Sequence, residues 1–215
     1  VYTSPEDGHL QKLAAAVAAT RWTTVLAGGP GTGKTYTVAR ILAVLDALQG
    51  PGLRIGLCAP TGRAAAQLQA SVEAESTVPV TAHAVTLHSL LGWRPGANPR
   101  YGRGRTLPHD VIVVDETSML SMTAMSRLLD AVRPDARVIF VGDPHQLASV
   151  EAGAVLADLV ERADVAGVQG DSGTVTAVSQ AALEAVGLDA DHELEPEDTD
   201  HLAGGVITLR RQFRF

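Results

Sequence analysis

The sequence predicts an α/β fold in which a mainly parallel, doubly wound sheet carries helices on both of its faces. Short apolar runs alternate with longer stretches of helical character along most of the chain. The run Val111–Val114 is continuously apolar, which is typical of a central parallel strand buried on both sides. A glycine-rich loop at residues 28–35 joins an apolar run to a helix, which is the arrangement of a phosphate-binding P-loop.

The elements are expected in a regular order along the chain. A helix over 11–19 precedes a strand over 23–27, and a helix from Thr35 to about residue 49 ends at Gly50-Pro51-Gly52. The later elements are expected to be a strand over 53–59, a helix from Thr61 to about residue 74, a strand over 111–114, a helix over 121–132, a strand over 137–141 and a short helix near 180–186.

The charge of the chain is unevenly distributed. The net charge is −7, but residues 151–205 contain 13 of the 24 acidic residues and only one basic residue, Arg162. The remaining positions carry a balance of +5, so the overall acidity does not exclude a nucleic-acid partner. We interpret residues 163–205 as a solvated acidic insertion or flexible loop.

Cysteine content and hydropathy narrow the class of protein. The single cysteine, Cys58, excludes an internal disulfide and suits a reducing, cytoplasmic setting. No apolar run approaches the ~20 residues that a membrane-spanning helix needs, so no membrane partner is expected.

The P-loop residues have separate chemical roles. Glycines at 28, 31 and 33 let backbone N–H groups turn inward around a polyphosphate with no Cβ in the way. Lys34 supplies a positive charge for the β- and γ-phosphates, and the Thr35 hydroxyl can hold Mg²⁺. The sequence therefore predicts a nucleoside triphosphate site formed by Gly28, Gly29, Pro30, Gly31, Thr32, Gly33, Lys34, Thr35 and Tyr36.

Two further groups of polar residues follow apolar strands. Asp115 is expected to hold Mg²⁺, and Glu116 to orient and deprotonate an attacking water. Two adjacent carboxylates at a strand end can instead cap the following helix, but the P-loop upstream favours the catalytic interpretation. In the turn after the next strand, Gln146 can contact a γ-phosphate and report its loss, or the turn is an ordinary connection without a ligand.

Five segments carry a family resemblance. GGPGTGKT, LCAPTGRAAAQL, TLHSLLG, VIVVDETSML and VIFVGDPHQLASVEAGAVLADL occur in the order found in superfamily-one helicases. They most closely resemble the RecD family, the alpha subunit of exodeoxyribonuclease V, which is a 5′-to-3′ DNA motor. The resemblance covers roughly residues 9–160 and resumes at 209–215. It implies a RecA-like P-loop NTPase fold, with 1–162 as motor domain 1A and 206–215 as a returning strand and the start of motif IV.

The resemblance also implies the roles of single residues. Gln11 matches the glutamine that reads the adenine edge, and Gln146 matches the γ-phosphate sensor. Arg214 resembles the motif-IV arginine that contacts the γ-phosphate. The implied cofactors are ATP and Mg²⁺. The expected catalytic residues are Lys34, Glu116, Gln146 and Arg214, and the expected metal ligands are Thr35 and Asp115.

For single-stranded DNA, the resemblance indicates Pro60, Thr61, Gly62, Arg63, Thr86 and His88. A strand-end turn that opens a helix at Thr61 offers free N–H groups to a phosphate, although Thr61 can equally be a simple helix cap. His88 can likewise be a histidine at the edge of the core. The arginine-rich stretch from Trp93 to Arg105 has the charge and aromatic surface for single-strand binding, or it is a solvated loop or a partner contact.

The resemblance implies an ATP-dependent DNA helicase or translocase that acts in double-strand break repair and recombination with the partner subunits of a helicase–nuclease complex. The family uses two RecA-like domains that close on the nucleotide, so this chain is expected to be the first motor domain of a longer protein. The alternative is a nucleotide-dependent binding module that holds ATP and partner subunits without useful turnover. Glu116 favours the enzyme, because a pure binding module needs no carboxylate that activates water.

Overall fold

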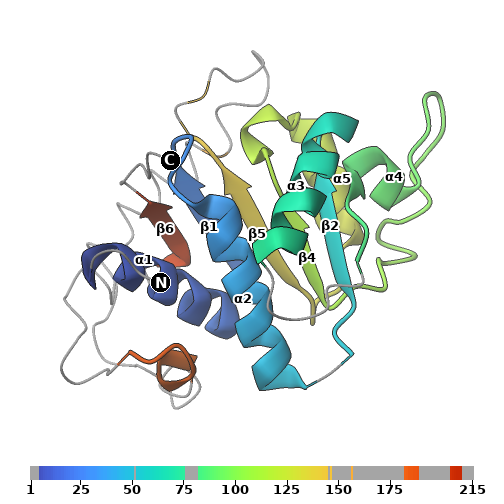
Figure 1. Cartoon of the computed structure of the whole chain (residues 1–215). Coiled ribbons are helices and arrows are strands. Elements are labelled where there is room, and N and C mark those ends of the chain that lie inside the picture. The colour runs from blue at the N-terminus through green and yellow to red at the C-terminus, as the bar shows by residue number, and fades with distance from the viewer. Residues whose placement is uncertain are drawn as a thin grey trace.

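The computed structural model describes residues 5–50, 52–75, 82–144, 146, 156, 182–188 and 204–209. Within these ranges six strands form one sheet: β1 (Thr23–Gly28), β2 (Ile55–Ala59), β3 (Val85–Thr86), β4 (Val111–Val114), β5 (Arg137–Gly142) and β6 (Val206–Leu209). The strand order is β3-β2-β4-β5-β1-β6, and each neighbouring pair is parallel (Figure 1). The predicted parallel sheet is confirmed.

Helices cover both faces of this sheet, as predicted for a doubly wound fold. They are α1 (Pro5–Thr20), α2 (Lys34–Gln49), α3 (Gly62–Glu75), α4 (Leu87–Leu91) and α5 (Met122–Ala131). The first three pack on one face, and α4 and α5 pack on the other. In the described part of the chain, no helix is long and apolar enough to cross a lipid bilayer.

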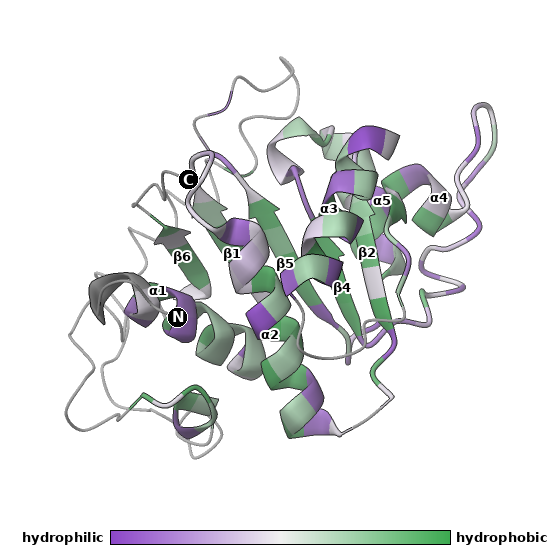
Figure 2. Ribbon diagram, in the orientation of Figure 1, coloured by the Kyte–Doolittle hydropathy of each residue, from purple (hydrophilic) through white to green (hydrophobic). Residues whose placement is uncertain are grey.

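The central strand β4 shows why a continuous apolar run is required. Val111 and Val113 contribute to the core beneath α1, α2 and α3. Ile112 and Val114 contribute to the core beneath α4 and α5. Successive residues of a strand point to opposite faces, and helices cover both faces of β4. All four side chains are therefore buried. In Figure 2 the strands are accordingly green along most of their length.

Several element boundaries differ from the prediction. The strand expected over 53–59 begins at Ile55, and the backbone N–H of Arg54 bonds the Asp110 carboxylate at 3.0 Å. The helix expected from Thr61 begins at Gly62, because the Thr61 hydroxyl caps it. The first helix starts earlier than expected, at Pro5. The helix expected over 121–132 spans Met122–Ala131 and follows an unpredicted 3₁₀ turn, η1 (Thr117–Met119).

Sequence patterns missed β3 and α4. The two-residue strand Val85–Thr86 is too short to show a period, and it exists because it pairs with the end of β2. The five-residue helix Leu87–Leu91 depends on its cap: the Thr86 hydroxyl accepts a hydrogen bond from the Ser89 N–H at 3.2 Å.

The acidic segment is described only at 182–188 and 204–205, and the rest of it lies outside the described residues. Ala182, Leu183 and Leu188 are buried in the same core as α1, whereas Glu184, Ala185 and Gly187 are exposed. Lys12 of α1 donates to the Gly187 carbonyl at 3.3 Å. Residues 182–185 are helical, which agrees with the short helix expected near 180–186.

A charged cluster ties together three segments at the N-terminal edge of the sheet. The Asp110 carboxylate, just before β4, accepts from Arg54 Nε at 3.0 Å and Nη2 at 2.7 Å. It also accepts from Arg133 Nη2, after α5, at 2.6 Å. The hydrogen bond from Arg54 is the main reason why the pKa of Asp110 lies below its ordinary value.

We expect Asp110→Asn to lower the free energy of unfolding by about 1–3 kcal/mol at pH 7, because both guanidinium groups lose a charged acceptor. A carboxyl whose pKa is lowered by folding stabilises the protein above the unfolded value of 3.8 and loses this contribution as the pH falls further. The difference between wild type and variant should therefore shrink in urea titrations at about pH 3. Asp135→Asn is the control, because Asp135 is 71% exposed and 3.4 Å from Arg133 Nε. Equal effects of the two variants would contradict the prediction.

Candidate functional site

The candidate site lies where β1, β4 and β5 end. Because β5 pairs in parallel with both β1 and β4, the segments that follow all three strands emerge at one edge of the sheet. These segments are the P-loop, the pair Asp115-Glu116, and the turn that contains Gln146. The structure therefore brings the P-loop, Asp115-Glu116 and the turn of Gln146 to one edge of the sheet.

The P-loop depends on backbone conformations that favour glycine. Gly31 has φ 75° and Gly33 has φ 80°, both in the left-handed region. Thr32 Oγ1 donates to the Gly29 carbonyl at 2.9 Å and closes the turn. The α2 helix begins immediately after Gly33, so its free N–H groups face the loop.

Lys34 folds over this loop. Its Nζ donates to the carbonyl oxygens of Gly28 at 2.8 Å and Gly29 at 2.9 Å. Burial lowers the pKa of Lys34, and the nearby carboxylates of Asp143, Asp115 and Glu116 act in the opposite direction. The ammonium group is thus partly desolvated, which strengthens its attraction for a phosphate.

Asp115 is a partly buried carboxylate with a raised pKa. Desolvation is the main cause, while the backbone N–H of Glu116, at 2.9 Å from Oδ1, and the Lys34 ammonium lower the pKa. A cation would favour the charged form of such a group. Asp115 and Thr35 line the same cavity, and one carboxylate, one hydroxyl and phosphate oxygens are ligands that suit Mg²⁺. The residues present therefore fit the predicted metal.

Glu116 has an unusual backbone. Among the described residues it is the sole non-glycine residue with a positive φ, at φ 50° and ψ 41°. A left-handed conformation costs about 1–2 kcal/mol for such a residue, and strain of this kind is typical of functional sites. The Glu116 side chain makes no capping hydrogen bond to η1, so the helix-capping alternative does not describe it.

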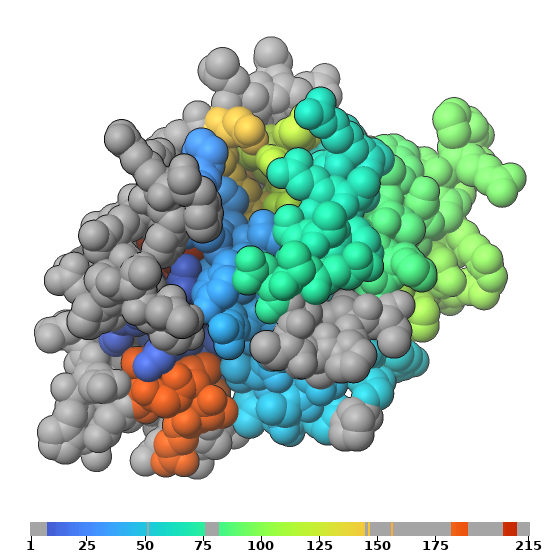
Figure 3. Space-filling model, in the orientation of Figure 1, coloured from blue at the N-terminus to red at the C-terminus, as the bar shows by residue number. Residues whose placement is uncertain are grey.

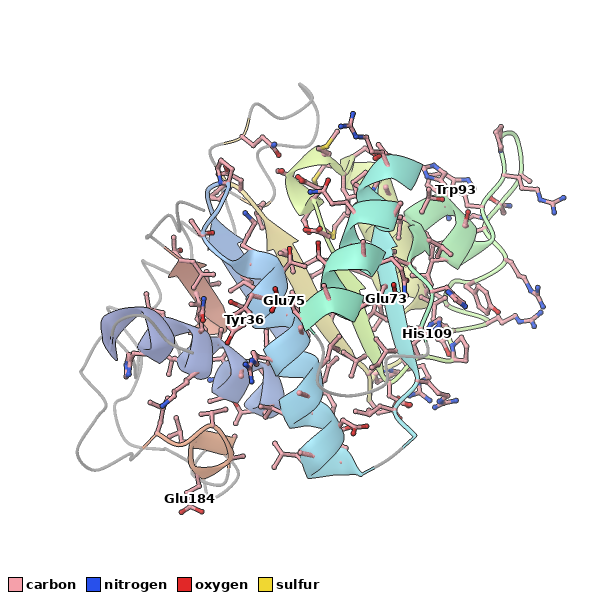
Figure 4. All side chains as sticks on the ribbon, in the orientation of Figure 1. Tyr36, Glu73, Glu75, Trp93, His109 and Glu184 are labelled. Carbon is pink, nitrogen blue, oxygen red and sulfur yellow. The ribbon has the colours of Figure 1, made fainter. Side chains whose placement is uncertain are left out.

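A cavity of about 560 Å³ opens beside these residues. Residues 30–36, Asp115 and Glu116 form one side, and α3 forms the other; Figure 3 shows the hollow between the blue P-loop region and the teal helix. Tyr36 and Glu75 line it from α2 and α3 respectively (Figure 4). The Arg40 guanidinium lies 5.0 Å from the Tyr36 ring centre. The volume suits a nucleotide-sized ligand.

The α3 wall of this cavity was not predicted. It consists of Ala64, Gln67, Leu68, Ala70, Ser71, Ala74 and Glu75. Small and polar residues at helical spacing are typical of any exposed helix, so they do not indicate a cavity wall. The one sequence feature that could have indicated this wall is the recurrence of small side chains at 64, 71 and 74.

Two other predicted residues, Gln11 and Gln146, are not part of the cavity lining. Gln11 is buried on α1, 6% exposed, and does not line the cavity. Gln146 lies beside η1, where its Oε1 accepts from Ser118 Oγ at 3.2 Å. Arg214 lies outside the described residues.

The predicted DNA residues lie along the sheet from the P-loop. Parallel pairing of Ala59 with Thr86 places the turn at 60–63 next to the start of α4. Thr61 and Thr86 both cap helices through their hydroxyls. His88 is exposed and stacks on Trp93, with ring centres 4.8 Å apart, and Trp93 packs against the core beneath α4 and α5.

The arginine-rich stretch after Trp93 makes many contacts within itself. Arg100 and Arg105 lie over the Tyr101 ring at 5.6 Å and 5.5 Å. Arg103 pairs with Asp130 of α5 at 2.8 Å. These contacts define the shape of the loop while leaving its arginines at the surface.

Comparison with known proteins shows which families this chain resembles. A family model described as an AAA domain matches residues 11–152. A RecBCD enzyme subunit RecD of Mycolicibacterium smegmatis is 59% identical over 165 residues, which are 70% of this chain and 30% of that protein. The ATP-dependent RecD2 DNA helicase of Deinococcus radiodurans is 44% identical over 139 residues, which are 65% of this chain and 18% of that protein. These relatives confirm the resemblance to the RecD family.

The chain spans about 30% of the length of the first of these curated relatives. Among solved structures, Pif1 helicase from Candida albicans is similar at 19% identity, with a TM-score of 0.45, over 99% of this chain and 41% of that one. That similarity is distant, and the fold assignment rests on the parallel sheet itself.

We expect Gly28→Ala to weaken nucleotide binding at least tenfold, since the added Cβ would meet backbone and side chain beneath the P-loop. It would lie 2.6 Å from Thr32 Oγ1 and 2.9 Å from the Leu209 carbonyl oxygen. Gly29→Ala is the matched control, because no atom lies within 4 Å of its added Cβ. Titration with a fluorescent ATP analogue, with circular dichroism to check folding, measures the difference. Equal affinities of the two variants would refute this account of the loop.

Proposed function

Because this chain belongs to the AAA domain family, we propose that it is the first motor domain of an ATP-dependent DNA helicase of the RecD type. One observation carries the proposal: a P-loop, a partly buried Asp115 and a strained Glu116 line one cavity. A switch or binding site needs the phosphate loop, but hydrolysis also needs a carboxylate placed to take a proton from water.

The proposed roles follow from the chemistry of each side chain. Lys34 and the loop N–H groups bind the β- and γ-phosphates of ATP, and Thr35 and Asp115 hold Mg²⁺. When bound, Mg²⁺ neutralises charge on the phosphate oxygens. Glu116 orients the attacking water and accepts its proton, while Gln146 contacts the γ-phosphate.

The remaining roles complete the proposal. Gln11 reads the adenine edge and Arg214 contacts the γ-phosphate, both through the family resemblance. The turn at 60–63, with Thr86 and His88, contacts single-stranded DNA. The pairing of Ala59 with Thr86 supports this role, because it places the two segments side by side, where they can contact the same strand of DNA.

At the level of the whole protein, we propose a larger assembly. The chain is part of a longer subunit of a RecBCD-type helicase–nuclease complex, a proposal supported by the name of the Mycolicibacterium smegmatis relative. It acts in the cytoplasm, in double-strand break repair and recombination, and moves 5′ to 3′. We further propose that a second motor domain completes the ATP site.

We expect Glu116→Gln in the full-length protein to lower the ATPase rate by about 10²–10⁴-fold, because the amide cannot accept the proton of water. ATP affinity should stay within about threefold, since the phosphate loop is untouched. Phosphate release and nucleotide titration measure the two quantities.

Glu75→Gln is the matched control, because Glu75 lines the same cavity from α3 without lying at a strand end. Unchanged turnover in Glu116→Gln would exclude the proposed water activation and favour a nucleotide-dependent binding module.

We expect Arg63→Ala to weaken single-stranded DNA binding several-fold and to reduce the slope of log affinity against log salt by about 0.7, as loss of one phosphate contact requires. Arg127→Ala, at an exposed position of α5, is the control for loss of charge alone. Fluorescence anisotropy at several salt concentrations measures both. Equal slopes for the two variants would show that Arg63 contacts no phosphate.

A further inference from the structure

The turn after β4 and the turn after β5 are joined by a partly buried hydrogen bond between side chains. Ser118 of η1 is 2% exposed, and its Oγ donates to Gln146 Oε1 at 3.2 Å. Glu116 lies two residues before Ser118. The bond therefore links the segment of the water-activating carboxylate with the segment of the proposed phosphate sensor.

Close backbone packing keeps the two turns in contact. A Cβ on Gly142, the last residue of β5, would lie 3.3 Å from the N–H nitrogens of both Thr117 and Ser118. Thr117 Oγ1 donates to the Val114 carbonyl at 2.9 Å, which fastens η1 to the end of β4. The position of Ser118 is thus set by both strands.

The direction of the hydrogen bond determines which end of the Gln146 amide is free. A glutamine amide has an accepting oxygen and a donating NH₂ group. Since Ser118 uses the oxygen, the NH₂ group remains for another partner. A phosphate oxygen accepts hydrogen bonds only, so it needs this donating end.

We propose that Ser118 is a positioning residue, whose hydroxyl holds the Gln146 amide with its Nε2 donor available to the γ-phosphate. The inference rests on the proposed function, in which Gln146 senses that phosphate. Without the hydroxyl, the amide rotates between two orientations, and only one of them presents a donor to the phosphate. Ser118 also connects Gln146 to Glu116, so that a shift of the sensor changes the position of the catalytic carboxylate.

The test compares Ser118→Ala, Gln146→Ala and the double variant in the full-length protein with Mg²⁺. The readout is the ratio of the dissociation constants for ADP and for a non-hydrolysable ATP analogue, from competition with a fluorescent nucleotide. Gln146→Ala should lower this preference for the triphosphate by about tenfold, and Ser118→Ala by about three- to tenfold. The double variant should match Gln146→Ala, because Ser118 acts through Gln146.

Thr117→Val is the control for a merely structural role. It removes a neighbouring buried hydroxyl from the same turn, and that hydroxyl bonds the Val114 carbonyl. We expect a lower melting temperature with an unchanged preference for the triphosphate.

The remaining outcomes separate the inference from the proposed function. If Gln146→Ala lowers the preference and Ser118→Ala does not, or if their effects add, the role of Ser118 is overturned and the sensor stands. If Gln146→Ala has no effect, the proposed sensor fails and the role of Ser118 fails with it.

Discussion

The parallel pairing of β5 with both β1 and β4 is the interaction on which the rest of the described structure depends. Phe140 of β5 is the register partner of Val25 on one side and of Val114 on the other. This shared partner fixes the start of the P-loop and the position of Asp115 relative to each other. A slip of one residue would exchange the two faces of a strand and expose its apolar side chains, so burial of both faces holds the site in register.

The site is assembled at an electrostatic cost that the fold has to offset. Burial lowers the pKa of Lys34 and raises that of Asp115, so both groups are disfavoured in their charged forms. Each group partly relieves the other, and Glu116 adds backbone strain. Burial of the apolar core on both faces of the sheet stabilises the fold and offsets these local costs.

The features that the sequence predicted are those with a local cause. The P-loop needs glycines at particular positions, and the β4 run needs apolar residues on two faces, so both appear in short windows of sequence. The α3 wall, the strand β3 and the bond between Ser118 and Gln146 arise from contacts between distant segments, which leave no periodic pattern. The burial of Leu183 was missed for the same reason, because its acidic surroundings dominate the local composition.

The edge strand β6 is distant in sequence from the strand that it joins. It pairs Leu209 with Gly28, directly beneath the phosphate loop, although it is joined to β5 by the connection between Gly142 and Val206. The Leu209 carbonyl oxygen lies 2.9 Å from the position that a Cβ on Gly28 would take. A substitution that displaces β6 therefore alters the start of the phosphate loop, although the two segments are far apart in sequence.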